Sequence, residues 1–191
     1  MGTLYVDKLD PQSGTTLSLG SSGDTLQATA GTTNNLGISE QDMWRITADA
    51  ANPSGDITAN WERCDTDGFA LLGTGLTESS GIFSFPSTGH WLIMASAQWF
   101  NASADERYVH LCIQTTEDNS SYSEASQTRG NCSGGSSTRN GGTYVSYCFD
   151  VTNTTNDKFK INVDNGNSNT NIAGDTNGNE TFIQVMKLAD T

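Results

Sequence analysis

Few side chains in this 191-residue sequence are of types that carry out chemistry at neutral pH, and their spacing matches no catalytic arrangement. Of the two histidines, we expect His90 in a tight turn and His110 on the polar-leaning face of a strand. Neither accompanies a Gly-x-Ser-x-Gly nucleophile motif at a strand-to-helix turn. Because acid–base catalysis needs positioned pairs of groups, we predict no catalytic residues and no enzymatic activity.

Two acidic segments have ligand-like composition. Asp65-Thr66-Asp67-Gly68 has the spacing of two oxygen ligands and a turn glycine, but a full calcium loop needs more ligands and a distal glutamate. We therefore interpret it as an Asp-Gly hairpin turn between strands at 61–63 and 69–71. Asp105-Glu106-Arg107 is expected to be a solvated turn, with a metal role left open. We predict no metal ligands and no cofactor.

The four cysteines are Cys64, Cys112, Cys132 and Cys148. None belongs to a Cys-x-x-Cys pair, and we find no histidine near them at zinc-ligand spacing. An even number permits disulfides, but the N-terminus lacks a basic region followed by an apolar one, so we expect no secretory signal. Folding in a reducing compartment then favours free thiols, most of them in the core.

The charge balance restricts the partners. Twenty-two acidic and nine basic side chains give a formal net charge of −13. Such a charge repels phosphate backbones and anionic membrane surfaces. The longest apolar stretch, 91–95, is too short to span a bilayer. We predict neither nucleic-acid nor membrane binding.

Strand patterns dominate the second part of the chain. In 108–114, Val109, Leu111 and Ile113 alternate with Tyr108, His110, Cys112 and Gln114, so the two sets should face opposite ways. Short strands separated by Gly, Asn, Ser and Thr turns predict an all-β sandwich or barrel. Residues 115–142 and 164–180 are predicted as long polar loops, either simple connectors or a recognition surface. The expected strands are 41–46, 82–85, 91–100, 108–114, 143–151, 158–163 and 181–188.

The first part of the chain consists of three short β-prone pieces between turn clusters. Each has two or three apolar side chains, too few to offset the entropy of ordering it. We therefore predict that residues 1–36 are an extended attachment or trimerisation segment that lies against other chains, and that 37–191 form the compact domain. The candidate attachment residues are Leu4, Val6, Leu9, Leu17, Leu19 and Leu26.

One hairpin carries a family resemblance. The run Gly81-Ile82-Phe83-Ser84-Phe85-Pro86-Ser87-Thr88-Gly89-His90-Trp91 resembles the "G-x-F-x-F-P-x-x-G-x-Y/W" core hairpin of the C1q/TNF-like jelly roll. The resemblance extends over about 40–190 and implies a jelly-roll β-sandwich. Because members of this family are typically trimers, it also implies a homotrimer packed through apolar residues. The interface candidates, each of which would otherwise be an ordinary core aromatic, are Trp99, Tyr108, Tyr144 and Tyr147.

Residues 1–36, which we call the leader, resemble the N-terminal segments of marine bacteriophage capsid-surface and tail-fibre proteins. This implies a non-enzymatic virion structural protein, made in the host cytoplasm and placed on the virion surface. We expect a trimeric capsid decoration (cement) or head-fibre protein whose residues 1–36 bind the major capsid protein or another virion protein. The alternative is a tail-fibre tip that recognises host-surface glycans through stacking on Trp61, Trp91 and Trp99.

Overall fold

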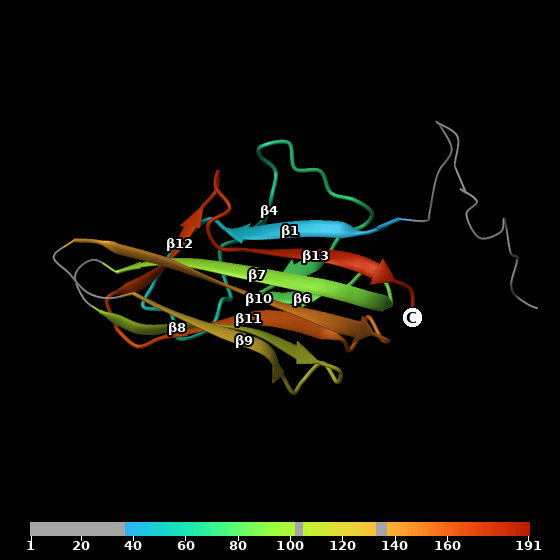
Figure 1. The fold of residues 1–191 in the computed structure, drawn as a ribbon. Helices are drawn as coiled ribbons and strands as arrows, with labels where there is room; N and C mark the ends of the chain where they lie inside the picture. Colours follow the sequence, from blue (N-terminus) through green and yellow to red (C-terminus); the bar gives the residue numbers. More distant parts are fainter. Residues whose placement is uncertain (1–36, 102–104, 133–136) are drawn as a thin grey trace, which may run out of the picture. The chain divides into compact units, whose positions relative to one another are not determined.

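The strands of the domain form two layers (Figure 1). The computed structural model describes residues 37–101, 105–132 and 137–191. The leader and its candidate residues Leu4, Val6, Leu9, Leu17, Leu19 and Leu26 lie outside these ranges, so the domain boundary after residue 36 stays a prediction. The described strands are β1 Gln41–Ile46, β2 Ala48–Ala51, β3 Gly55–Asp56, β4 Trp61–Arg63, β5 Thr77–Ser79, β6 Ile82–Ser84, β7 Gly89–Asn101, β8 Glu106–Thr116, β9 Ser123–Cys132, β10 Arg139–Val151, β11 Lys158–Asn165, β12 Thr170–Asp175 and β13 Phe182–Ala189.

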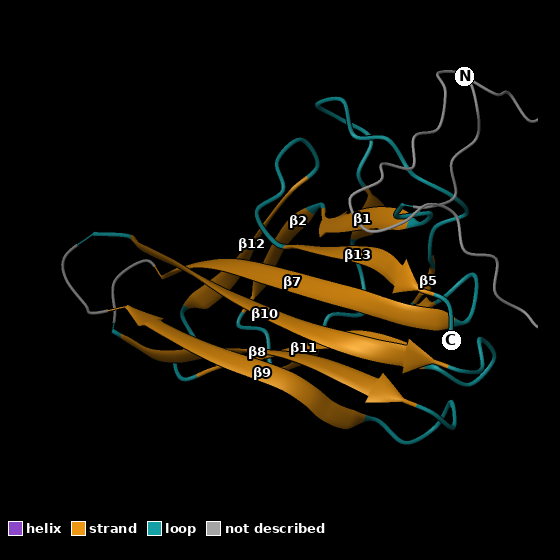
Figure 2. Cartoon of the chain, turned by 45° about the vertical axis from the view of Figure 1, so that its right-hand side comes forward, coloured by secondary structure: helices purple, strands orange, loops and turns teal. Residues whose placement is uncertain are grey.

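All strand pairs are antiparallel, and most neighbours are distant in sequence. In the first sheet, the β7 sheet, β7 pairs along its length with β10 and on its other side with β13 and β12, and the layer continues through β1 and β4 and through β2. The second sheet, the β8 sheet, runs β5-β6-β11-β8-β9, with β3 also paired to β11. Figure 2 shows the two layers face to face. This is a jelly-roll β-sandwich, as expected.

The core lies between the inner faces of the two sheets, and period-two alternation builds it. On β8, Val109, Leu111 and Ile113 are fully buried, as predicted. The opposite face of β8 departs from the prediction, because His110 and Cys112 are buried there as well. Other core residues are Trp91, Ile93, Ala95, Ala97 and Trp99 from β7 and Phe159, Ile161 and Val163 from β11.

The hairpin that carried the resemblance has the expected structure. Phe83 and Phe85 both point into the core, where Phe83 stacks on Phe159 with ring centroids 5.0 Å apart. Phe85 packs against Trp91 at 5.2 Å. Gly89, with a φ of 138°, begins the long strand β7. The aromatic spacing in the sequence therefore places this hairpin at the centre of the core.

Two predicted loops are wrong. Residues 115–142 contain β9 and the beginning of β10, and 164–180 contain β12. Their Ser, Thr, Asn and Gly composition suggests loops, but backbone pairing with β8 and β7 makes them strands. β9 and β10 lie at the edges of their sheets, whereas β12 lies between β2 and β7.

Two short predictions need correction as well. Asp67 and Gly68 have the positive φ values of a hairpin turn, as expected, but 69–71 form no strand, and only Leu72 bridges back to Gln41. Glu106 is 1 % exposed at the start of β8 rather than in a solvated turn. Its carboxylate accepts hydrogen bonds from the Gly166 N–H and the Thr170 hydroxyl.

Candidate functional site

The four interface candidates do not share one surface. Trp99 is 1 % exposed within a single chain, which corrects its assignment, because its ring has no surface left for a partner. Tyr147 packs against the core from the inner side of β10. Tyr108 lies on the other sheet and donates its hydroxyl hydrogen to Asp164. Only Tyr144, 53 % exposed, points outward from the β7 sheet.

Tyr144 belongs to the first of three rows of side chains on the outer side of the β7 sheet. Residues directly opposite one another on neighbouring strands project on the same side, so the register of β10, β7, β13 and β1 defines each row. We call these side chains the outer β7 face. Its rows are Tyr144–Ser96–Phe182, then Ser146–Met94–Gln184–Met43, then Cys148–Leu92–Met186–Gln41.

None of these eleven side chains carries a charge, although the whole chain has a net charge of −13. Six are large and apolar or aromatic: Tyr144, Phe182, Met94, Met43, Leu92 and Met186. The corresponding rows of the β8 sheet instead include Lys160 and Glu124 in one row and Asp164 and Arg129 in another. Removing uncharged surface from water is far less costly than removing charges. The outer β7 face is therefore the side of the sandwich better suited to contact another protein.

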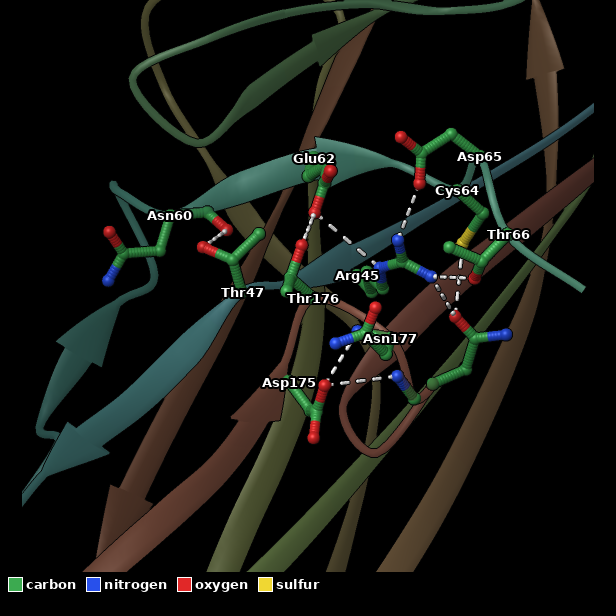
Figure 3. A network of polar contacts seen from close by, with 12 residues as sticks. Arg45, Thr47, Asn60, Glu62, Cys64, Asp65, Thr66, Asp175, Thr176 and Asn177 are labelled. Atoms are coloured by element: carbon green, nitrogen blue, oxygen red, sulfur yellow. Dashed lines mark hydrogen bonds and ion pairs between the residues drawn. The ribbon is translucent and has the colours of Figure 1, made fainter.

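A buried arginine, Arg45, lies beside the first row of this face, and Figure 3 shows the polar network around it. Arg45, which follows Phe182 in the first row, is 0 % exposed. Its guanidinium lies 2.7 Å from the Asp65 carboxylate and 3.6 Å from that of Glu62. It also donates to the Thr66 hydroxyl at 2.9 Å. Asp65 and Thr66, from the segment with calcium-loop spacing, therefore bind the buried guanidinium of Arg45.

At the opposite end, His90 and Asp150 lie side by side in register, with 3.8 Å between Nδ1 and Oδ1. Both side chains are about half exposed. A polar groove of about 350 Å³ adjoins the Tyr144 row, lined by Gln98, Asn140, Glu180 and their neighbours. Polar groups therefore border the uncharged rows, as they border the centre of many protein interfaces.

The cysteines divide between core and surface. All four, which lie within the described residues, are free thiols, but only Cys64 and Cys112 are buried. Cys132 is partly exposed, and Cys148 is exposed on the outer β7 face opposite Leu92. The expectation that most thiols lie in the core holds for two of the four.

The tryptophans proposed to stack on glycans are mostly inaccessible. Trp91 and Trp99 are each 1 % exposed. Trp61 is partly buried and donates its indole hydrogen to the Ile57 carbonyl at 2.8 Å. Sugar stacking requires an exposed ring face, so these residues do not favour the glycan-binding alternative.

Comparison with known proteins identifies the fold through structure alone. No protein-family model matches the sequence, and no curated protein matches it significantly. Among solved structures, Eiger TNF from S. frugiperda has a TM-score of 0.58 and 11 % identity, over 79 % of this chain and 93 % of that one. Murine APRIL has a TM-score of 0.53 and 13 % identity, over 78 % and 98 %. This chain has a TNF-like jelly-roll fold.

On this TNF-like sandwich, most of the outer β7 face escaped sequence reasoning. Leu92, Met94, Phe182 and Met186 were not among the predicted site residues. A signal was present in 91–100, where apolar residues occupy both faces of one strand. Such a run indicates a strand covered on both sides, whereas within 37–101, 105–132 and 137–191 the outer-side residues Leu92, Met94 and Ser96 are only partly buried. Among the described residues no helix is long and apolar enough to cross a bilayer.

Proposed function

We propose that the protein is a non-enzymatic structural protein that assembles as a homotrimer through its outer β7 face. The observation that carries this proposal is the set of three rows whose solvent-accessible side chains are uncharged, on one side of a strongly acidic sandwich. Of the six large side chains on this face, Tyr144 is exposed and the other five are partly exposed, and contiguous accessible apolar surface marks interaction sites in soluble proteins. A cyclic trimer closes its contacts and leaves no patch open for further association.

The TNF-like fold supports the same choice of face. The resemblance found in the hairpin 81–91 implies trimers packed through apolar residues, and the outer β7 face is the uncharged, apolar-rich side of the sandwich. Tyr144 at its edge has a rigid, largely exposed ring, which is the kind of side chain that contributes strongly to interfaces.

We further propose that the trimer is displayed on a virion, as a capsid decoration or head-fibre protein, and that residues 1–36 attach it. The composition of the leader, which cannot supply its own core, supports this role. The net charge of −13 supports a protein surface as its partner, because phosphate and anionic lipid surfaces repel the chain. The major capsid protein is the partner we favour.

Sedimentation equilibrium of the full chain tests the trimer. We expect about three times the 20.3 kDa mass of one chain at micromolar concentration. Tyr144→Glu places three carboxylates in the closed interface and should shift the protein to monomers. The control Thr77→Glu, at an exposed strand position of the β8 sheet, should leave the trimer intact. A monomeric wild type, or equal association of the two variants, would exclude this interface.

Thiol labelling gives a second readout of the same interface. Cys148 lies on the outer β7 face and should be shielded in the trimer, so iodoacetamide should modify it faster in Tyr144→Glu than in the wild type. Cys132, on β9 of the other sheet, serves as the internal reference. An unchanged ratio of Cys148 to Cys132 labelling would contradict burial of Cys148 between chains.

Deletion of residues 1–36 tests attachment separately. The truncated chain should remain a trimer but no longer co-sediment with particles, while the full chain does. Retained co-sedimentation would refute the role of the leader. Immuno-electron microscopy of labelled particles then distinguishes placement over the shell from placement on a tail.

A further inference from the structure

The polar side of β8 brings together three side chains that commonly bind metals. His110 and Cys112 are two residues apart and therefore project on the same side of β8. A bulge in the pairing of β8 with β9 changes the register between Ile113↔Ser126 and Gln114↔Glu124, which turns Glu124 to the same side. Figure 1 labels the two neighbouring strands.

The three groups converge closely. One nitrogen of His110, the sulfur of Cys112 and one carboxylate oxygen of Glu124 all lie within 4.8 Å of one another. His110 and Cys112 are 7 % and 0 % exposed, whereas Glu124 is exposed. The sequence-based statement that no histidine lies near a cysteine at ligand spacing is therefore revised. His110 and Cys112, two residues apart on one strand, bring their ligand atoms together.

The amide of Gln127 joins two of these groups. His110 Nε2 lies 2.9 Å from Gln127 Oε1, and Gln127 Nε2 donates to Glu124 Oε2 at 3.1 Å. Because the amide oxygen is only an acceptor, this arrangement makes His110 Nε2 the donor. The imidazole and the carboxylate are thus held near each other by one side chain that can rotate away or offer its oxygen as a further ligand.

We propose that His110, Cys112 and Glu124 form a binding site for zinc or a similar borderline-soft divalent cation. Thiolate, imidazole and carboxylate together suit Zn²⁺, whereas Ca²⁺ and Mg²⁺ prefer oxygen ligands only. Ligand atoms around tetrahedral zinc are about 3.3 to 3.6 Å apart, which follows from metal–ligand distances of about 2.0 to 2.3 Å. The three ligand atoms, now within 4.8 Å of one another, must therefore draw together when the metal binds, and the exposed side chain of Glu124 is the one of the three that is free to move. Water or Gln127 Oε1 completes four-coordination.

Binding exchanges a proton for the metal. Burial, followed by the charges of Glu124 and Asp56, raises the pKa of the Cys112 thiol to about 11, so the metal-free thiol is protonated at neutral pH. Coordination breaks the S–H bond, forms a Zn–S bond and releases one proton to solvent, without any change of oxidation state. The bound metal would link β8 to β9, the edge strand of the β8 sheet, and would therefore stabilise this edge.

Cobalt titration of the reduced full chain tests the site, because Co²⁺ reports thiolate ligands through a charge-transfer absorption band that Zn²⁺ then removes. We expect the band in the wild type and in Cys148→Ser, and its loss in Cys112→Ser. Glu124→Gln should retain the fold, since Glu124 is exposed, and weaken binding by at least about tenfold. Glu117→Gln is the matched exposed control and should bind like the wild type.

Thermal unfolding with Zn²⁺ gives an independent readout. Zn²⁺ should raise the unfolding temperature of the wild type and of Glu117→Gln but not that of Glu124→Gln. The proposal is overturned if the wild type gives no thiolate-to-cobalt band, if the band depends on Cys148 rather than Cys112, or if Glu124→Gln and Glu117→Gln bind equally.

Discussion

The carboxylate of Asp42 on β1 and the guanidinium of Arg63 on β4 meet in a partly buried ion pair, with 3.0 Å between Oδ1 and Nε. Asp42 is 1 % exposed and also accepts hydrogen bonds from the Leu76 N–H at 2.8 Å and the Trp44 indole at 2.9 Å. Arg63 in turn donates to the Leu76 carbonyl. Through Leu76, this ion pair holds the segment that follows β4 against the edge of the β7 sheet.

We expect Asp42→Ala to lower the free energy of unfolding by about 2–4 kcal/mol, because it leaves a partly exposed guanidinium, the buried Leu76 N–H and the partly buried Trp44 indole without their acceptor. Urea unfolding followed by tryptophan fluorescence measures the change. Asp190→Ala, which breaks an ion pair between Lys187 and an almost fully exposed carboxylate, is the control and should leave the midpoint unchanged. Equal midpoints for the two variants would contradict a structural role for Asp42.

The ring of Trp99 lies against glycines of β10, which pairs with β7, and of β9, which belongs to the other sheet. A Cβ at Gly141, opposite Trp99 on β10, would come within 2.6 Å of the indole, and one at Gly130 on β9 within 2.2 Å. At Gly142 the nearest atom is the Ala97 carbonyl oxygen at 3.7 Å. Gly141→Ala should therefore destabilise the fold by about 1–3 kcal/mol more than Gly142→Ala, because the core must shift to admit the methyl group. Matching urea midpoints for the two variants would show that Trp99 moves freely.

Asp118 should make stability depend on acid pH. The N–H groups of Ser121 and Ser120 and the hydroxyl of Thr116 hold the pKa of this carboxyl well below its usual range. A folded-state pKa below the unfolded one stabilises the protein above pH 3.8, and this contribution disappears as the pH falls through the folded pKa. The difference in unfolding midpoint between wild type and Asp118→Asn should therefore shrink below about pH 4. A pKa near 4 for the Asp118 carboxyl of the folded protein, measured by NMR, would contradict this prediction.

The core and the central strands were predictable because their signals are local. Alternation placed Val109, Leu111 and Ile113 on one face, and the aromatic pair Phe83 and Phe85 placed the hairpin in the core. The strands β9 and β12 were not predictable, because pairing with β8 and β7 specifies them and their only large apolar side chain is Ile172 of β12. Trp99 was a candidate for the trimer interface or for the core, and the glycines that make room for its ring in the core were uninformative until the strands were aligned.

The sequence by itself determined the class of fold, since strand periodicity and turn residues act over a few positions at a time. It also determined the chemical character of the protein, including its negative charge. Only the tertiary structure decided which side chains meet. Register between strands far apart in the chain puts Tyr144, Leu92 and Met186 on one uncharged face. A bulge in β9 brings Glu124 to His110 and Cys112. Pairing across the sheet is a property of the folded chain as a whole, and for this reason both proposed sites became visible only in the assembled sandwich.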